Sequence, residues 1–256
     1  GIHLNCSLIN KYTMRAFGLI GYPLGHSFSK KYFTDKFERE GITGNAYELY
    51  PLEQIGQLED LLVSNPDLAG LNVTIPYKEQ VIAYLDSMSP VVEEIGACNC
   101  IRIEDGHLIG HNTDVIGFSR ALLPQLKPHH KRALILGTGG SSKAVAYSLK
   151  ELNIPFLQVS RTPGNGMIAY EEIDQSMLEA HTLLINTTPV GMYPDVMKAP
   201  AIPYAFIGAD HYLFDLVYNP EQTRFLQEGA LRGAAVENGS DMLVIQAEAS
   251  WEIWNR

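Results

Sequence analysis

Strand-like apolar segments alternate with helical segments along most of the chain, and this alternation limits the fold more than any other feature. Near the start, "AFGLIG" is followed by the helical "SKKYFTDKFEREG". Further on, "RALILGTGGSSKAVAYSLKELN" has the pattern of a strand, a glycine turn and a helix. This order is typical of β/α units with a largely parallel sheet. The sequence therefore predicts an α/β protein.

Two modules of this kind can be distinguished. The first continues through the strand-like "LAGLNVTIP" and a helix that is expected to begin near Tyr77. The second contains the strand-like "FLQVSR", "TLLINTT" and "YLFDLVY". The segment "LPQLKPHHK", residues 123–131, is polar and has two prolines, so it is predicted to be the connection into the second module.

Charge and cysteine content argue against several classes of function. The 256 residues include 29 Asp and Glu against 19 Lys and Arg, a net charge of −10, whereas binding to a phosphate backbone needs clustered cations. No apolar run reaches the roughly 18 residues that a membrane span needs. Cys6, Cys98 and Cys100 leave one cysteine unpaired under any disulfide scheme. We therefore expect a cytoplasmic protein that binds neither nucleic acid nor membrane.

The N-terminal segment "GIHLNCSLINKYT" lacks the basic-then-apolar order of a signal peptide. Met14 directly precedes a strand-like segment. We expect Met14 to be the natural start.

The glycine turn in "LILGTGGSSKA" is the first chemical signal. Gly137 and Gly139 follow a predicted strand and precede a predicted helix, which is the context of a dinucleotide-binding turn. Glycines let the backbone approach a pyrophosphate, and the helix N-terminus favours its negative charge. Ser142 stands where the usual third glycine would be, and a plain tight turn is the alternative interpretation.

The next strand indicates which nucleotide is bound. "QVSRT" ends in Arg161, where an NAD enzyme would have Asp or Glu for the ribose hydroxyl. Arginine at this position favours the phosphate of NADP. An exposed arginine that merely follows a strand is the alternative.

Seven segments, "GYPLGHSFS", "GLNVTIPYKEQV", "GHNTDVIGF", "GTGGSSKA", "NTTPVGM", "DLVYNP" and "NGSDMLVIQA", occur in the order and spacing of the shikimate dehydrogenases. The chain resembles that family from about Met14 to the C-terminus. The resemblance implies NADP-dependent, reversible reduction of 3-dehydroshikimate to shikimate, a step of aromatic amino-acid (chorismate) biosynthesis.

The resemblance also implies the domain organisation. It gives a two-domain α/β chain with an N-terminal substrate-binding α/β domain at residues 14–115. A Rossmann-type NADP-binding domain follows at residues 116–237, and the C-terminal segment 238–256 returns to the first domain. The active site is expected in a cleft between the domains, whose closure would exclude water during hydride transfer.

Lys78 and Asp114 correspond to the family's catalytic pair. Hydride that arrives at a ketone carbon leaves negative charge on the oxygen, and an ammonium group beside that oxygen can stabilise and protonate it. The resemblance implies that Asp114 holds both the ammonium and a substrate hydroxyl. It assigns the pair without assigning the transferable proton to either member. The alternative for Lys78 is a solvated residue in the first turn of a helix.

The resemblance also implies the residues that bind the substrate. Ser27 and Ser29 would bind its carboxylate, while Asp114 and the residues listed below would reach its ring hydroxyls. Each serine could instead cap the following helix, and Gln246 could lie on the surface of the last helix. The other substrate-binding positions are Thr74, Asn99 and Gln246 for the hydroxyls, and Tyr218, which would close the pocket.

The predicted cofactor-binding positions lie in the glycine turn and in turns that follow later strands. The segment "TPGNGM" lacks the second basic residue of many NADP-dependent members, so the preference for NADP over NAD is expected to be modest. The positions are Gly137, Thr138, Gly139, Gly140, Ser141, Ser142, Ser160, Arg161, Thr162, Thr187 and Gly239.

The sequence departs from the family in a few places. Lys30 stands where the family typically has proline, and Cys98 and Cys100 flank Asn99 where valine and threonine are common. The Cys-Asn-Cys spacing does not suit zinc, so no metal is predicted. His26 and His111 are expected near the site, either tuning the pocket or making structural hydrogen bonds.

Two rival functions stay open at this point. The first is a quinate/shikimate dehydrogenase with broader substrate range or NAD use. The second is a non-catalytic nucleotide-binding sensor of the same fold, against which the presence of both Lys78 and Asp114 argues. The expected partner is a small-molecule substrate, shikimate or 3-dehydroshikimate, and the chain is expected to be a monomer or a homodimer.

Overall fold

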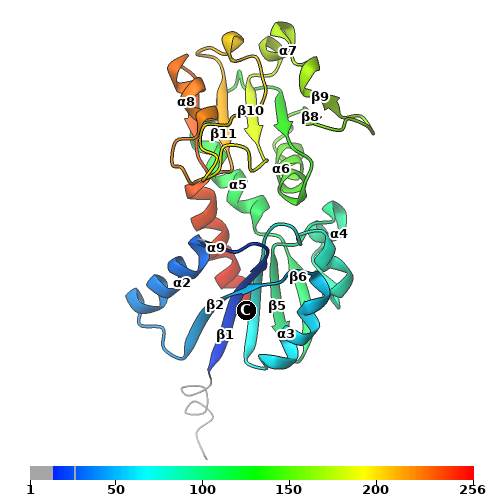
Figure 1. Cartoon of the computed structure of the whole chain (residues 1–256), viewed down its shortest axis with the longest axis vertical. Helices are drawn as coiled ribbons and strands as arrows, with labels where there is room; N and C mark the ends of the chain where they lie inside the picture. The colour runs from blue at the N-terminus through cyan, green and yellow to red at the C-terminus, as the bar shows by residue number, and fades with distance from the viewer. Residues whose placement is uncertain (1–13, 26) are drawn as a thin grey trace, which may run out of the picture. The chain divides into compact units, whose positions relative to one another are not determined.

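The computed structural model of the chain describes residues 14–25 and 27–256 (Figure 1). Residues 1–13, with Cys6, and His26 lie outside the described residues, so the expectations for them are not addressed. The chain forms two compact units. Unit 1 comprises the residues up to Asn112 together with Ser250–Arg256, and unit 2 comprises Thr113–Ala249. The functional domain boundaries 14–115, 116–237 and 238–256 stay a prediction.

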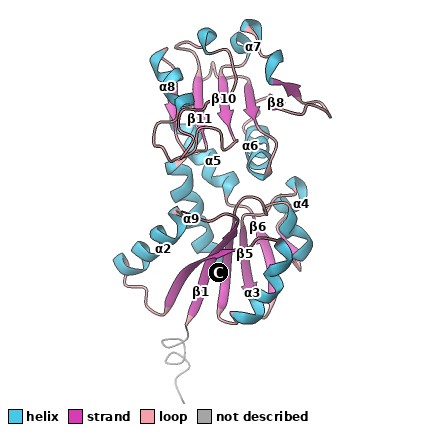
Figure 2. Cartoon of the chain, viewed as in Figure 1, coloured by secondary structure: helices cyan, strands magenta, loops and turns pink. Residues whose placement is uncertain are grey.

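Unit 1 is built on a mixed sheet whose described strands lie in the order β2-β1-β3-β5-β6-β4 (Figure 2). The β1–β2, β1–β3 and β4–β6 pairs are parallel, and the β3–β5 and β5–β6 pairs are antiparallel. The strands are β1 (Arg15–Gly21), β2 (Asn45–Pro51), β3 (Leu68–Val73), β4 (Ser87–Met88), β5 (Cys100–Glu104) and β6 (His107–His111). The helices are α2 (Phe28–Arg39), α3 (Leu58–Ser64) and α4 (Pro90–Ile95), with 3-10 helices η1 (Ile55–Gln57) and η2 (Gln80–Tyr84).

The topology brings four chain segments to one end of this sheet. Ile20 near the end of β1 lies opposite Val73 at the end of β3, because the two strands are parallel. The antiparallel β5 begins at the same end, with Cys100 opposite Asn72. β6 ends there, with His111 opposite Cys100. We call this end of the sheet the site edge of unit 1.

The C-terminal residues complete the core of unit 1. The Trp254 ring stacks on Phe17 with 4.8 Å between centroids, and its Nε1 donates to the Ile101 carbonyl at 3.0 Å. Gly70 in β3 leaves room for this ring, since a Cβ there would lie 2.3 Å from Trp254 Nε1. The last turn of α9 (Ser240–Trp254) therefore packs on the sheet of unit 1.

Unit 2 contains a parallel sheet in the order β12-β11-β10-β7-β8-β9 (Figure 1). Counted within the unit, this is the 6-5-4-1-2-3 order of a Rossmann fold, whose topological switch point lies between β7 and β10. The strands are β7 (Ala133–Leu136), β8 (Phe156–Ser160), β9 (Ile168–Ala169), β10 (Leu183–Asn186), β11 (Tyr212–Asp215) and β12 (Ala235–Glu237). The helices are α5 (Asp114–Leu122), α6 (Gly140–Glu151), α7 (Gln175–Ala180), α8 (Arg224–Leu231) and most of α9, with η3 (Leu123–Gln125), η4 (Tyr170–Glu172) and η5 (Tyr204–Phe206).

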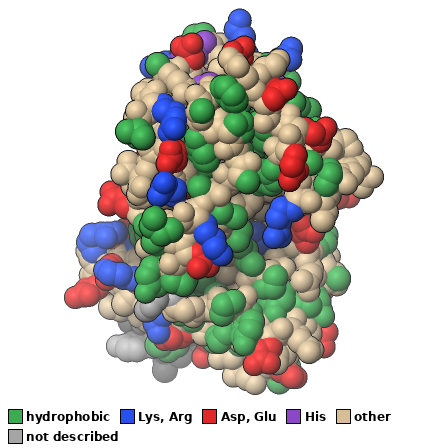
Figure 3. All heavy atoms as spheres, turned by 45° about the horizontal axis from the view of Figure 1, so that its top comes forward, with side chains coloured by type: hydrophobic (Ala, Val, Ile, Leu, Met, Phe, Trp, Pro, Cys, Tyr) green, Lys and Arg blue, Asp and Glu red, His purple; other side chains and the backbone are tan. Residues whose placement is uncertain are grey.

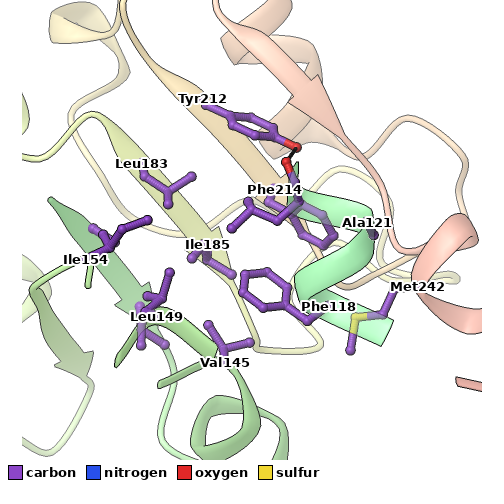
Figure 4. Close-up of a cluster of buried hydrophobic side chains, with 13 residues drawn as sticks. Phe118, Ala121, Val145, Leu149, Ile154, Leu183, Ile185, Tyr212, Phe214 and Met242 are labelled. Carbon is purple, nitrogen blue, oxygen red and sulfur yellow. Dashed lines mark hydrogen bonds between the residues drawn. The ribbon is translucent and has the colours of Figure 1, made fainter. Parts of the chain in front are cut away.

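The central strands of unit 2 are buried on both faces, as a parallel sheet covered by helices requires. Every residue of β7, β10 and β11 is buried. Figure 4 shows the cluster on one side, where Phe118 of α5 meets Phe214 of β11 edge to face at 5.0 Å. Met242 of α9 belongs to the same cluster. α5 and the first part of α9 are thus fixed by the core of unit 2.

The helix predicted to begin near Tyr77 is wrong in kind. Tyr77 and Val81 are both buried at the i, i+4 spacing of an α-helix, which explains the prediction. The segment instead begins as a turn, in which the Tyr77 N–H donates to the Thr74 carbonyl at 3.0 Å, and continues as the short 3-10 helix η2. The predicted connection, residues 123–131, joins α5 to β7.

The surface carries both signs of charge. On the face drawn in Figure 3, Lys and Arg side chains are interspersed with Asp and Glu. No helix in residues 14–25 and 27–256 is long and apolar enough to cross a membrane.

Candidate functional site

Three predicted residues are tied together by main-chain hydrogen bonds at the site edge of unit 1. Thr74 follows β3, and its N–H donates to the Ile20 carbonyl at 2.9 Å. The Asn99 carbonyl accepts from the Val73 N–H at 2.8 Å, and the Lys78 carbonyl accepts from the Cys98 N–H at 2.8 Å. The segments that carry Thr74, Lys78 and Asn99 are therefore held side by side. Asn99 is buried, while Lys78 is partly exposed.

Ser27 stands at the N-cap position of α2 but does not cap it. Its side chain makes no cap hydrogen bond, and its Oγ is buried without a hydrogen-bond partner among the described residues. An unpaired buried hydroxyl costs about 1–3 kcal/mol. A ligand acceptor such as a carboxylate oxygen would remove that cost, so the geometry fits the predicted substrate contact better than the capping alternative.

Ser29 lies in the first turn of α2, two residues after Ser27, and is partly exposed. Phe33, one turn further along the same helix, is buried and stacks on the ring of Tyr47 in β2 with 4.7 Å between centroids. This contact fixes α2, with its first turn, on the sheet of unit 1.

In unit 2, the packing of α5 against α9 brings Asp114 and Gln246 to one place. Asp114 is the first residue of α5 and is buried. Gly117 allows α9 to approach closely, since a Cβ there would lie 2.9 Å from the Met242 carbonyl oxygen. Thr113 Oγ1 donates to Gln246 Oε1 at 3.5 Å.

These contacts exclude a surface position for Gln246, and they show that Thr113 also lies at this place. Gln246 is 7% exposed, so it is not a surface residue of the last helix. Thr113 is 1% exposed and was missed by the sequence analysis, although it directly precedes Asp114 in "HNTDVIGF". Its position next to Asp114 was the only signal in the sequence that could have indicated Thr113.

The glycine turn lies at the topological switch point of the unit 2 sheet. Gly137, which follows β7, has φ +113°, a conformation that side chains with a Cβ rarely adopt. A Cβ at Gly137 would also lie 2.5 Å from Oγ1 of Thr187, which follows β10. Thr187 Oγ1 in turn donates to the Leu136 carbonyl at 2.7 Å. Gly137 and Thr187 are therefore in direct contact.

The next glycine has a different environment. Gly139 is the N-cap of α6 at φ −77°, and a Cβ there would meet no atom within 4 Å. Thr138 and Gly139 are exposed, and Gly140 is partly exposed. The start of this 12-residue helix therefore borders open space, as the binding of a pyrophosphate requires.

Ser142 stabilises the glycine turn through hydrogen bonds. It is fully buried, and its hydroxyl donates to the Gly139 carbonyl at 2.6 Å. Gln158 Nε2 donates to Ser142 Oγ at 3.2 Å and to the Gly137 carbonyl at 3.4 Å. A serine can replace the third glycine here because its hydroxyl is fully paired. Gln158 was not foreseen, because nothing in the sequence links the middle of β8 to the turn.

The predicted phosphate-binding segment follows β8. Ser160 Oγ accepts from the Thr162 N–H at 3.1 Å, which shapes the turn. Arg161 and Thr162 are exposed. Burial raises the pKa of Tyr170, and the nearby Arg161 guanidinium partly opposes this effect. An exposed guanidinium at this position is compatible with both sequence interpretations.

Tyr218 and Gly239 lie on neighbouring segments after β11 and β12. The Gly239 N–H donates to the Val217 carbonyl at 3.2 Å, and a Cβ at Gly239 would lie 2.0 Å from the Leu216 carbonyl oxygen. Only glycine allows this approach. The segment with Tyr218 is thereby fixed against the start of α9.

The described residues contain no group of three or more His, Cys, Asp or Glu side chains that could hold a metal ion. Cys98 and Cys100 are free thiols buried in unit 1, and burial raises the pKa of Cys100. A Rossmann unit joined to an α/β unit with threonine, lysine and asparagine at its site edge defines a class: two-domain oxidoreductases that use a nicotinamide nucleotide.

Comparison with known proteins identifies the family within this class. Residues 19–101 match the model of the shikimate dehydrogenase substrate binding domain. The chain is 38% identical over 251 residues to the shikimate dehydrogenase (NADP(+)) of Clostridium beijerinckii, covering 94% of this chain and 92% of that one. It is 36% identical over 256 residues to the enzyme of the same name from Methanococcus maripaludis strain C6, covering 93% and 90%.

Comparison with solved structures indicates the same family. Shikimate 5-dehydrogenase from Thermus thermophilus, in complex with NADP(H) and shikimate, superposes with a TM-score of 0.84 at 32% identity, covering 94% of this chain and 93% of that one. The chain belongs to the shikimate dehydrogenase family. The predicted fold class, an α/β substrate-binding domain with a Rossmann-type nucleotide-binding domain, is confirmed.

Proposed function

We propose that this chain catalyses the NADP-dependent, reversible reduction of 3-dehydroshikimate to shikimate, a step of aromatic amino-acid biosynthesis. The observation that carries the proposal is the similarity to NADP-dependent shikimate dehydrogenases over 93–94% of the chain, which spans both units. The predicted domains, a substrate-binding domain at residues 14–115 with 238–256 and a nucleotide-binding domain at 116–237, are part of the proposal.

The fit to NADP rests on the turn after β7. Gly137 leaves no room for a side chain, and the exposed start of α6 presents the N-terminal end of a helix to a pyrophosphate. Arg161, with Ser160 and Thr162, would bind the ribose phosphate, while Thr187 and Gly239 would border the nucleotide. When bound, NADP supplies or accepts the hydride. The role of these residues is to hold it at the switch point of the sheet.

The fit to the substrate rests on polar side chains that can donate hydrogen bonds to, or accept them from, a small molecule rich in oxygen atoms. Ser27 and Ser29 would bind the carboxylate with neutral donors, and Ser27 Oγ has no protein partner among the described residues. Further contacts to the ring hydroxyls would complete recognition of a small, polar, anionic molecule. These contacts would come from Thr74, Asn99, Asp114 and Gln246, and Tyr218 would close the pocket.

Lys78 and Asp114 would carry the proton chemistry. In the reductive direction, negative charge develops on the carbonyl oxygen, and the Lys78 ammonium would stabilise and protonate that oxygen. Asp114 would accept a hydrogen bond from a substrate hydroxyl and balance the ammonium charge. The proposal assigns the pair, and the transferable proton belongs to the pair as a whole.

The test is a spectrophotometric turnover assay with shikimate and with quinate, each against NADP and NAD. We expect the highest kcat/KM for shikimate with NADP. Comparable kcat/KM for quinate would favour a quinate/shikimate dehydrogenase, and absence of turnover with every pair would favour a nucleotide-binding sensor. The proposal includes a cytoplasmic enzyme that acts as a monomer or a homodimer, which light scattering would distinguish.

A further inference from the structure

One amide side chain connects the two ends of the glycine turn. Gln158 in β8 donates from Nε2 to the Gly137 carbonyl at 3.4 Å and to Ser142 Oγ at 3.2 Å. Gly137 directly follows β7, and Ser142 lies in the first turn of α6. A primary amide has two N–H donors, so both bonds form at once. Gln158 therefore joins the strand end before the turn to the helix after it.

The hydrogen bonds continue to the N-cap of α6. Ser142 Oγ donates to the Gly139 carbonyl at 2.6 Å, and the Ser142 N–H donates to the same carbonyl at 3.1 Å. Because the Ser142 hydroxyl accepts from Gln158 while it donates to Gly139, each bond polarises the other. A Cβ at Gly139 would meet no atom within 4 Å. The turn is thus held through its carbonyl groups, while the outer side of Gly139 is open.

The register of the sheet explains why β8 supplies this side chain. Gln158 lies opposite Ile135 of β7, and paired residues of neighbouring strands point to the same face. Ile135 belongs to the buried cluster that also contains Val145 and Leu149 of α6. Gln158 is therefore on the face that α6 covers. An amide on such a face needs polar partners, and the glycine turn provides them.

We propose that Gln158 is a positioning residue that holds the glycine turn in the shape that binds the pyrophosphate of the nucleotide. The inference rests on the proposed function, in which NADP binds at this turn. The third glycine of the usual fingerprint allows a helix to pack closely on a strand. Here Ser142 stands at that position, and its hydroxyl is bonded to the side chain of the strand. A turn that is already held in the free protein loses less freedom when the ligand binds, which increases the affinity.

The experiment titrates the full chain with NADP and with NAD by calorimetry, without substrate, and compares wild type with Gln158→Leu. Leucine has a similar size and removes both N–H donors. Both nucleotides contain the pyrophosphate, so we expect the two Kd values to rise by the same factor, about 3–10-fold, the range of one hydrogen bond. At saturating NADP, kcat and the KM for shikimate should change less than about 2-fold.

Gln125→Leu is the matched control, because Gln125 Nε2 also makes two bonds within unit 2. It donates to the Val236 carbonyl at 2.9 Å and to Glu237 Oε2 at 3.1 Å. This control should lower the melting temperature without changing either Kd. A rise for NADP alone in Gln158→Leu would show that Gln158 acts through the segment with Arg161, three residues further along, and would overturn the inference.

The inference and the proposed function can fail separately, because nucleotide binding is measured without turnover. Absence of turnover with normal NADP binding would overturn the proposed activity, and the Kd values would still decide the inference. A wild-type protein that binds neither nucleotide would overturn both. Unchanged Kd values in Gln158→Leu, or an equal rise in Gln125→Leu, would overturn the inference alone. Should Gln158→Leu fail to fold, Ser142→Ala removes the hydroxyl that Gln158 contacts: a parallel rise of both Kd values supports the inference, and unchanged values contradict it.

Discussion

Asn186 donates a hydrogen bond from Nδ2 to Oδ1 of the fully buried Asp215 at 3.1 Å, joining the ends of neighbouring strands β10 and β11. The same carboxylate accepts from the Val217 N–H at 3.0 Å and from Thr223 Oγ1 at 2.7 Å. Thr223 caps α8. One buried carboxylate therefore fixes the segment that carries Tyr218 and the turn that follows Thr187.

We expect Asp215→Asn to lower the free energy of unfolding by about 1–3 kcal/mol, because an amide cannot accept from all three donors. The loss should depend on pH. Burial raises the pKa of Asp215 to about 6, and the bond from Thr223 partly opposes it. A folded pKa above the unfolded value stabilises the fold at low pH, and this contribution is lost as pH rises through about 6.

The measurement is denaturant unfolding of both proteins between about pH 4 and pH 7. Asparagine does not titrate, and the contributions of the other titrating groups to the free energy of unfolding cancel when the two proteins are compared at the same pH. The difference between wild type and variant should therefore be larger at about pH 4 than at about pH 7. A difference that grows with rising pH would contradict a raised pKa for Asp215.

Gly137→Ala should destabilise unit 2 by about 2–3 kcal/mol and weaken NADP binding. Alanine is strained at φ +113°, and its Cβ would lie 2.5 Å from Thr187 Oγ1, so the turn must move. Thermal unfolding and NADP titration by calorimetry measure the two effects.

Gly139→Ala is the matched control for stability. Its φ is −77° and its Cβ would meet nothing within 4 Å, so the melting temperature should change little. Equal destabilisation by both variants would show that the strain at Gly137 is not the cause.

The sequence predicted features that depend on local pattern and missed those that depend on pairing between distant segments. Alternating strands and helices indicated the α/β class, and the glycine turn was correctly placed before α6. The hydrogen bond from Tyr47 to Asn72 depends on which strands are neighbours and on their register. The local periodicity of the sequence determines neither. The contact of Gln158 with Ser142 is of the same kind.

The segment after Thr74 shows a different limit. Buried residues at i and i+4 indicate a helical turn but do not distinguish an α-helix from the observed turn and 3-10 helix. Ser27 shows the converse: its sequence position fits a helix cap, and only the folded structure reveals that its hydroxyl is buried and lacks a partner among the described residues.

Arg161→Ala should weaken NADP binding by about 10–150-fold and leave NAD binding almost unchanged. A guanidinium would pair with the ribose phosphate through charge-assisted bonds worth about 1.5–3 kcal/mol, which NAD cannot make. No second basic residue in "TPGNGM" would compensate, which places the expectation in the upper half of the range. Dissociation constants for both nucleotides provide the measurement, and an equal loss for both would indicate that Arg161 supports the fold.

Lys78→Ala should lower kcat by about 10²–10⁴-fold, the range for a positioned acid or base, while the KM for shikimate changes far less. The backbone of Lys78 is fixed by the bond from the Cys98 N–H to its carbonyl, which the substitution keeps. The melting temperature should therefore stay near that of wild type. Near-normal turnover in a folded variant would remove Lys78 from the catalytic pair.

Asp114→Asn should slow turnover and, unlike Lys78→Ala, clearly weaken shikimate binding. An aspartate at this buried position would accept a substrate hydroxyl proton, and asparagine replaces one of its acceptor oxygens by a donor. The size of the side chain is kept, so α5 should still pack on α9 through Gly117 and Met242. Calorimetric titration with shikimate measures the affinity, and Thr113→Val is the comparison, because it removes the bond to Gln246 while leaving the carboxylate. Shikimate affinity that stays at the wild-type value in Asp114→Asn would rule out a hydroxyl-accepting role for Asp114, whatever happens to kcat.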